Sequence, residues 1–149
     1  MNKLGIMVSL RNAIEDAISV KTLVKYDGIV LPDKKPFAYI ESLESFQYEQ
    51  SKQRESIRKD NRYQIGLYAN SLAERMSLQD DISSLLTFHE FTYYNEDGEE
   101  TDKTFEVDAD FSEMPIPNDD ISNKTDNFRM FFDISVFTHD YRTNYMRRK

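Results

Sequence analysis

The stretch from Pro36 to Asn70 constrains the fold more than any other part of the chain. It opens with Phe37-Ala38-Tyr39-Ile40, a run of strand-forming residues. It closes with Tyr63, Ile65 and Leu67, whose two-residue spacing is typical of a half-buried strand. The two ends therefore predict the base of an antiparallel hairpin that lies in a hydrophobic core.

The middle of this stretch predicts a hairpin that is longer than its core. Phe46 and Tyr48 continue the extended pattern past an irregularity at 42–45, and residues 49–61 are thoroughly polar. A hairpin that extends beyond its own core usually contacts another molecule, so we expect an arm at about 44–62 that stands in water. The interface candidates on this arm are Phe46, Tyr48, Lys52, Arg54, Arg58 and Lys59.

Two amphipathic helices are predicted around the hairpin. The first runs from about Leu4 to about Lys21, and its apolar face recurs at three- and four-residue spacing. The second runs from Ser71 to about Thr87. Ser71 followed by Glu74 is a capping-box signature, in which the hydroxyl accepts a hydrogen bond from the Glu74 amide and the carboxylate reaches back.

The remaining elements are expected to be short strands and one clear final strand. Residues 23–26 indicate an extended piece, and residues 91–93 and 105–109 alternate around a turn at 95–98, which predicts a second hairpin. Met130 to Phe137 alternates with aromatic residues on both faces. A Pro-punctuated acidic loop is expected at 110–127 and a flexible basic tail at 143–149.

Together these elements predict an α+β fold. We expect an antiparallel or mixed sheet of about four to six strands, with two main helices packed on one face and a long protruding hairpin. At 149 residues with 39% hydrophobic side chains, one domain spanning 1–149 is the default.

Composition narrows the class of protein further. The chain has no cysteine, which excludes disulfides and thiolate chemistry and fits an intracellular folding compartment. No apolar run approaches the roughly 18 residues of a membrane span, so we expect a soluble protein without a membrane partner.

Charge is distributed unevenly along the chain. Residues 89–126 hold thirteen acids and two lysines, a net charge of −11, whereas the whole chain has −8 and the remainder therefore +3. One surface is predicted to be strongly acidic, and such a surface repels nucleic acid. A solvated loop region is the simpler interpretation of the same segment, which includes an acidic insertion at about 95–127.

Catalytic motifs are missing from the sequence. There is no G-x-x-x-x-G-K-[ST], G-x-G-x-x-G, G-x-S-x-G or H-E-x-x-H pattern. His89-Glu90 and His139-Asp140 are adjacent pairs, and neighbours on a strand point to opposite faces, which disfavours a shared metal site. Asp108 and Asp110, with Glu106, are expected on one strand face and offer oxygen ligands for a divalent cation. We expect no catalytic residues and no cofactor, with a small metal-dependent enzyme as the alternative.

The basic hairpin tip suits two kinds of partner. Five basic residues lie between Lys52 and Arg62, against Glu55 and Asp60, and nearby tyrosines offer rings for base stacking. Because most of the remaining charge is negative, we favour a protein partner over nucleic acid.

The order of elements resembles that of a known family. An amphipathic helix (Met7 to Ile18) precedes a long hairpin (Phe37 to Tyr68), then a helix entered through Tyr68-Ala69-Asn70-Ser71 and ending at Leu85-Leu86, and an alternating strand (Met130 to Phe137). This succession, which covers nearly the whole chain, is similar to that of the tail terminator and tail-to-head joining proteins of long-tailed phages. The acidic insertion stands outside that pattern.

The resemblance implies a structural virion protein of the tail or neck that is assembled in the host cytoplasm. Its copies would form a homohexameric ring that ends the tail tube and joins the tail to the head, with tail tube protein and head-completion or connector protein as partners. Passing DNA would meet the ring without sequence-specific binding, repelled by acids in the lumen. The lumen candidates are Glu96, Asp97, Glu99, Glu100, Asp108 and Asp110. A regulatory protein-binding module that uses the acidic segment remains the other alternative.

Overall fold

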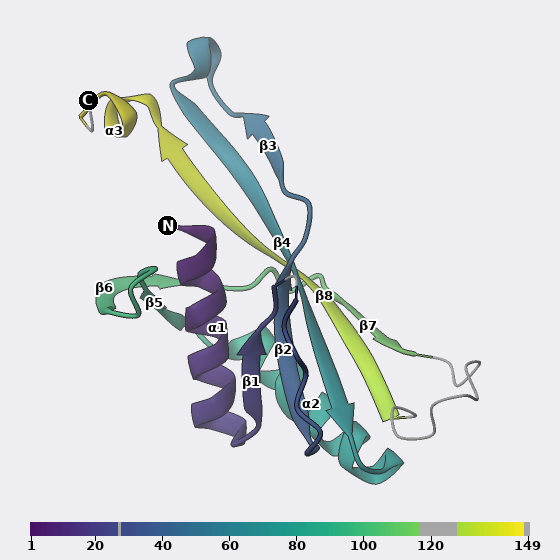
Figure 1. Ribbon diagram of the computed structural model, residues 1–149. Helices are drawn as coiled ribbons and strands as arrows, with labels where there is room; N and C mark the ends of the chain where they lie inside the picture. Colours follow the sequence, from purple (N-terminus) through teal and green to yellow (C-terminus); the bar gives the residue numbers. More distant parts are fainter. Residues whose placement is uncertain (27, 117–127, 148–149) are drawn as a thin grey trace.

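The computed structural model describes residues 1–26, 28–116 and 128–147. Within these ranges the chain is α+β, as predicted, with three α-helices, a mixed six-stranded sheet and a separate two-stranded sheet (Figure 1). The helices are α1 (Lys3–Ile18), α2 (Leu72–Phe88) and α3 (Arg142–Arg147). No described helix is long and apolar enough to cross a membrane.

The large sheet is built around its two longest strands. Its order is β1 (Lys21–Val24), β2 (Phe37–Ser42), β4 (Ser56–Ala69), β8 (Phe128–Tyr141) and β7 (Ser112–Pro115). The short β3 (Phe46–Glu49) also pairs with β4, beyond the end of β2. β1 and β2 are parallel, whereas the other pairs are antiparallel.

Both main helices pack onto the same apolar face of this sheet. α1 lies against β1 and β2, and α2 lies against β4 and β8. Ile40, Ile65 and Phe132 are opposite one another on neighbouring strands and point into the shared core. The helices contribute to this core with Ile6, Leu10, Ile14, Ile82 and Leu86.

The C-terminal end of α1 differs from the sequence prediction. At the start, the Asn2 side chain accepts a hydrogen bond from the Leu4 amide at 2.8 Å. At the end, Ser19 adopts a left-handed φ of 63°, which stops the helix after Ile18. The prediction that α1 extends to Lys21 is wrong, because Lys21 already begins β1.

The capping box of α2 is confirmed in its first half. The Ser71 hydroxyl accepts from the Glu74 amide at 3.1 Å. The Glu74 carboxylate accepts from the backbone amide of Asn70 at 2.8 Å, one residue before the expected position. Both contacts satisfy amide groups at the start of the helix that have no partner within it.

The small sheet consists of β5 (Phe91–Tyr94) and β6 (Glu100–Phe105), joined by the turn at 95–99. The expected hairpin is present, but the strand predicted at 105–109 is misplaced, since β6 ends at Phe105. α1 holds this sheet closely. The buried Ser9 hydroxyl accepts from the Tyr94 amide at 2.7 Å and donates to the Gly5 carbonyl at 2.6 Å.

β4 and β8 extend far beyond the core. Each has 14 residues, and they pair along their whole length, from Ser56 with Tyr141 to Ala69 with Phe128. At 3.3 Å per residue such a strand spans roughly 46 Å. Their outer halves, with β3 and α3, form an arm that protrudes from the body (Figure 1). Below, "the arm" means residues 46–60 and 137–147.

The structure of the arm differs from the sequence prediction in two details. The predicted hairpin has two strands, whereas the arm has three, because β8 continues beside β4 on the side away from β3. The final strand was expected to end at Phe137 but continues to Tyr141. Residues 142–147 form α3, residues 148–149 lie outside the described residues, and the flexibility expected from 143 stays a prediction.

Candidate assembly interface

One face of the arm carries three of the predicted interface residues. Residues that pair across strands lie on the same face of a sheet, as do residues two apart on one strand. The pairing places two cross-strand rows on one face, namely Phe46 with Asp60 and Phe137, and Tyr48 with Arg58 and His139. We call these six residues the arm face.

The arm face combines exposed rings with ordered polar contacts. Phe46 is 39% exposed and Tyr48 is 52% exposed, although both are large and apolar. The guanidinium of Arg58 lies 4.0 Å from the centroid of the Phe137 ring. The His139 Nδ1 atom lies 2.9 Å from the Gln50 side-chain oxygen. The face thus combines exposed rings with one cation, Arg58, and one acid, Asp60, and its rings are open to a partner.

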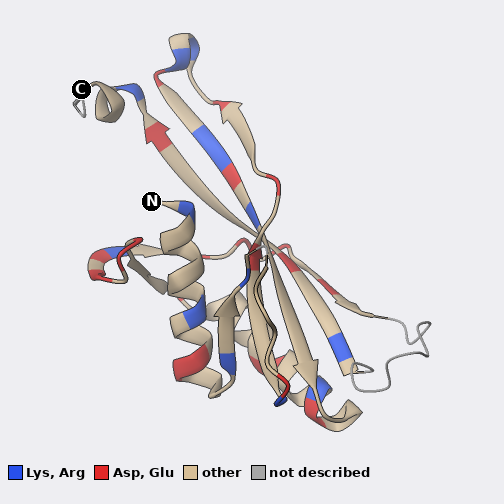
Figure 2. Ribbon diagram, in the orientation of Figure 1, with Lys and Arg blue, Asp and Glu red and all other residues tan. Residues whose placement is uncertain are grey.

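The other three interface candidates lie elsewhere on the arm. Lys59 pairs with Gln47 and Thr138, so it belongs to the opposite face. Lys52 and Arg54 lie in the 3₁₀ turn η1 (Lys52–Arg54) at the tip, where both are exposed (Figure 2). The six candidates therefore divide into an aromatic face, a basic tip and one lysine on the reverse side.

Sequence reasoning missed the contribution of the C-terminal segment to the arm. The Arg142 amide donates to the Glu55 carbonyl at 2.9 Å, which fixes the start of α3 beside the tip. Tyr141, Tyr145 and Met146 are more than half exposed there. Tyr141 comes two residues after His139, so both lie on the same face of the strand. This two-residue spacing is the sequence signal that could have extended the predicted strand to Tyr141.

Polar contacts order the base of the arm. Asn61 is 2% exposed, and its side-chain amide donates to the Val136 carbonyl and to the Thr138 hydroxyl, each at 3.0 Å. On the helix side, the Lys3 ammonium donates to the Ser45 hydroxyl at 2.7 Å. Since these contacts join β4 to β8 and α1 to the β2–β3 link, the arm leaves the body in a defined direction.

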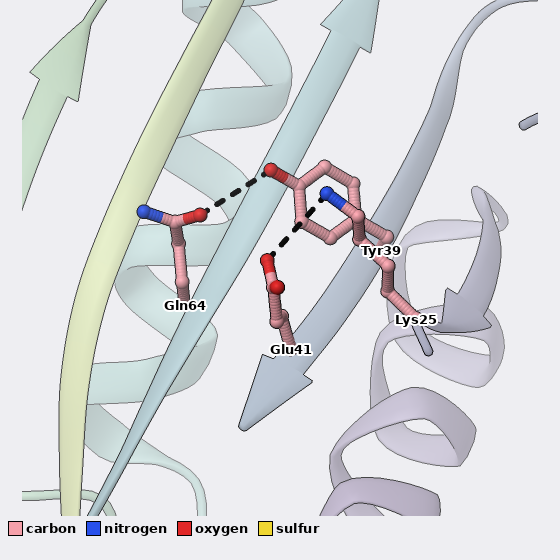
Figure 3. Close-up of polar contacts among 4 residues, drawn as sticks. All are labelled: Lys25, Tyr39, Glu41 and Gln64. Atoms are coloured by element: carbon pink, nitrogen blue, oxygen red, sulfur yellow. Dashed lines mark hydrogen bonds and ion pairs between the residues drawn. The ribbon is translucent and has the colours of Figure 1, made fainter. Parts of the chain in front are cut away.

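Below the arm, side chains of β2, β4 and the residue that follows β1 contact one another on the sheet face opposite the helices (Figure 3). The Lys25 ammonium lies 3.5 Å from the Glu41 carboxylate and 4.7 Å from the centroid of the Tyr39 ring. The Tyr39 hydroxyl donates to the Gln64 side-chain oxygen at 3.3 Å. Burial, and to a lesser extent the neighbouring Tyr68, raises the pKa of Tyr39 well above its ordinary value. Tyr39 is therefore a neutral, structural residue.

Four of the six acidic candidates gather at the turn of the small sheet. Glu96, Asp97, Glu99 and Glu100 are all exposed there (Figure 2). The Asn95 side-chain oxygen orders the turn by accepting from the Asp97 amide at 3.0 Å and from the Glu99 amide at 2.9 Å. We call residues 95–103 the acidic turn.

Asp108 and Asp110 lie apart from that turn, in the link between β6 and β7. The Asp108 amide donates to the Ser135 carbonyl of β8 at 2.8 Å, and the Asp108 carboxylate accepts from the Asp110 amide at 3.3 Å. Residues 106–110 are not a strand, so the expectation that Glu106, Asp108 and Asp110 share a strand face is wrong. Among the described residues, no three His, Asp or Glu side chains are grouped so as to hold a metal ion.

The acidic loop predicted at 110–127 is only partly described. It includes the exposed strand β7, whereas residues 117–127, with three of the acids, lie outside the described residues. The −11 segment thus contributes to at least two separate places rather than to one continuous patch. The expectation that the acidic candidates line the lumen of a ring stays a prediction.

Comparison with models of known protein families finds no match, and comparison with curated proteins finds no relative. A functional proposal therefore rests on three surface features of the structure, namely the arm face with its exposed rings, the basic tip of the arm and the acidic turn.

Proposed function

We propose that this chain is a structural subunit of a phage tail or neck. Its copies assemble through the arm into a homohexameric ring that terminates the tail tube and joins the tail to the head connector. Its partners are other copies of itself, the tail tube protein and the head-completion protein. DNA passes the ring without sequence-specific binding.

The observation that carries this proposal is the exposed arm face. Phe46 and Tyr48 lie on a three-stranded extension outside the hydrophobic core, where 39% and 52% of their surfaces are exposed. Tyrosine, phenylalanine and arginine are enriched at the centres of protein interfaces, where their rings supply large apolar contact areas. A face that combines Phe46, Tyr48 and Arg58 is thus suited to protein contact.

Ring symmetry suits an interface of this size. Each arm presents a small surface, and a single weak contact of this kind would give little affinity. In a closed ring every copy makes the same contact with both of its neighbours, so two contacts must break before a copy leaves the ring. The buried Asn61 contacts at the base of the arm support the same function, since a fixed arm loses less conformational entropy on docking.

The experiment compares two double variants that each remove two exposed apolar side chains. Phe46→Ser/Tyr48→Ser alters the arm face. Tyr26→Ser/Val30→Ser alters two exposed residues in the β1–β2 connection and serves as the matched control. Sedimentation velocity and negative-stain imaging, with and without tail tube protein, would measure assembly.

We expect six-fold rings from the wild-type and control chains and a folded monomer from the arm variant. Thermal unfolding should change little in the arm variant, because both side chains lie outside the core and are partly exposed already. A wild-type chain that stays monomeric even beside tail tube protein would contradict the proposal. Normal rings from the arm variant would show that the arm face is not the interface.

A further inference from the structure

The tip of the arm and the acidic turn have opposite charge. Residues 49–59 hold four basic side chains, of which Lys59 faces the reverse side of the arm, and two acids, Glu49 and Glu55, a net charge of +2. Residues 96–103 hold five acids and one lysine, Lys103. All the charged side chains of the turn are exposed, as are Lys52 and Arg54 at the tip. These are two compact, accessible surfaces of opposite sign on one chain.

Neither surface is neutralised by ion pairs inside the described part of the chain. The ion pair found there joins Lys25 to Glu41 on the body of the sheet, away from both surfaces. Lys52 and Arg54 form no ion pair with any described residue, and neither do Glu96 and Asp97. The charge of each surface is therefore available to a partner of opposite sign.

Each surface also has apolar side chains beside its charges. On the arm these are Phe46 and Tyr48. Next to the acidic turn lies the start of α1, because the Asn2 amide donates to the Tyr93 hydroxyl at 2.7 Å. Met1 and Leu4, at this end of α1, are 42% and 44% exposed. Apolar and charged areas are thus combined on both surfaces.

The two surfaces project from different parts of the molecule. The arm tip is the far end of β3 and β4, whereas the acidic turn is the end of the separate small sheet (Figures 1 and 2). A contact between them in two copies would join unlike surfaces. Such a head-to-tail contact repeats from copy to copy and closes into a ring when the rotation between copies allows it.

We propose that the arm of one copy docks onto the acidic turn and the adjacent start of α1 of the next copy. The basic tip lies against Glu96 and Asp97, and the exposed rings of the arm cover Met1 and Leu4. This inference rests on the proposed ring and names the surface that receives the arm. It also assigns the acids of the turn to the contact between copies rather than to the lumen.

Charge reversal tests this contact in a way that separates it from misfolding. Lys52→Glu/Arg54→Glu makes a chain whose tip and turn are both acidic. Glu96→Lys/Asp97→Lys/Glu99→Lys makes a chain whose tip and turn are both basic, since the turn then has four lysines and two acids. The matched controls are Lys21→Glu/Lys34→Glu and Asp16→Lys/Asp80→Lys/Asp81→Lys, which reverse exposed charges on the body.

Each reversed chain alone should require at least tenfold higher concentration than the wild type to form rings at low salt, because like charges then meet at every contact. An equimolar mixture should assemble again, since alternating copies restore opposite charges at every contact. The control chains should assemble as the wild type does. Because the two chains rescue each other, loss of assembly through misfolding is ruled out by the same experiment.

The outcomes separate this inference from the proposed function. Wild-type rings together with normal rings from either reversed chain would overturn the inference alone, as would a mixture that fails to assemble. Normal rings from a reversed chain are the result expected if the acids of the turn line the lumen. Absence of wild-type rings would contradict both proposals.

A cross-linking experiment tests the same contact with the natural charges nearly intact. The chain has no cysteine, so introduced thiols are the only ones present. Gln53→Cys and Asp97→Cys are made in separate chains, mixed under assembly conditions and treated with a short bismaleimide. We expect a cross-linked dimer that contains one copy of each variant. Equal cross-linking when Asp80→Cys replaces Asp97→Cys would overturn the inference.

Discussion

The guanidinium of Arg58 on β4 stacks on the ring of Phe137 on β8, 4.0 Å from its centroid. This contact joins the two long strands outside the hydrophobic core, at the level where Tyr48 and Phe46 are exposed on β3. Arg58 therefore has two roles in this account. It stabilises the arm and presents a cation on the arm face.

Replacement of Arg58 should separate these two roles. An exposed cation–π contact contributes about 0.5–1 kcal/mol, so Arg58→Ala should lower the free energy of unfolding by no more than about 1 kcal/mol. Its effect on ring assembly should be larger than that of Lys59→Ala, which removes a cation from the opposite face. Urea unfolding of dilute monomer and sedimentation velocity would measure the two effects. Equal losses of assembly would contradict the assignment of the arm face.

Gly66 should tolerate no side chain while Tyr39 is present. A Cβ atom at position 66 would overlap the Tyr39 ring, which lies across the strand at this point. Overpacking of this kind typically costs about 1–3 kcal/mol, so we expect Gly66→Ala to destabilise the fold by that amount.

A double-mutant cycle checks the cause of this loss. In a Tyr39→Ala background the ring is absent, so Gly66→Ala should then cost much less than in the wild type. Urea unfolding of the four chains gives the coupling free energy. An unchanged cost would show that the glycine is required for the backbone of β4 rather than for the ring.

Ser9 should be essential for holding the small sheet against α1. Its buried hydroxyl is the acceptor for the part-buried Tyr94 amide at 2.7 Å, and Ser9→Ala would leave that amide without this partner. An unsatisfied buried donor costs about 1–3 kcal/mol. We expect this loss in thermal unfolding, with almost none for Ser77→Ala on the exposed side of α2. Similar losses in both variants would count against the role of Ser9 in placing the acidic turn.

The sequence pattern predicted those helices and strands that have one side buried in the hydrophobic core. Alternation of Tyr63, Ile65 and Leu67 located the base of β4, and Ser71 with Glu74 located the start of α2. These signals are strong because one side of each element lies in the core. The parallel pairing of β1 with β2 left no such signal, since the pattern of a short strand does not reveal its direction.

The outer half of β8 could not be recognised in the same way. Thr138, His139 and Asp140 belong to the strand, yet all three are polar because both faces of the arm are open to solvent. Sequence therefore indicated the exposed arm but missed its third strand. Gly66 did carry a usable signal, because glycine inside a strand often marks a close approach of another group.

Alkaline pH should destabilise the protein through its buried tyrosines. Burial raises the pKa of Tyr63 well above its ordinary value, with the nearby Tyr93 adding to the effect. The folded state therefore favours the neutral phenol. The resulting stability is fully present below about pH 10, the pKa of an unfolded tyrosine, and is lost as pH rises toward the raised value.

The variant Tyr63→Phe tests this origin of the alkaline loss. Phenylalanine cannot ionise, so the free energy of unfolding should decline less steeply above about pH 10 than in the wild type. Urea unfolding at several pH values on either side of that point would measure the slopes. Parallel slopes for the two chains would exclude Tyr63 as a cause.

The most direct test of the whole account is the mass of the assembled protein. Native mass spectrometry of the wild-type chain at increasing concentration, with and without tail tube protein, would measure it. We expect a dominant species of six times the 17.6 kDa of one chain. We also expect Phe46→Ser/Tyr48→Ser to remove this species. A monomer under every condition would contradict the central claim that the arm builds a ring.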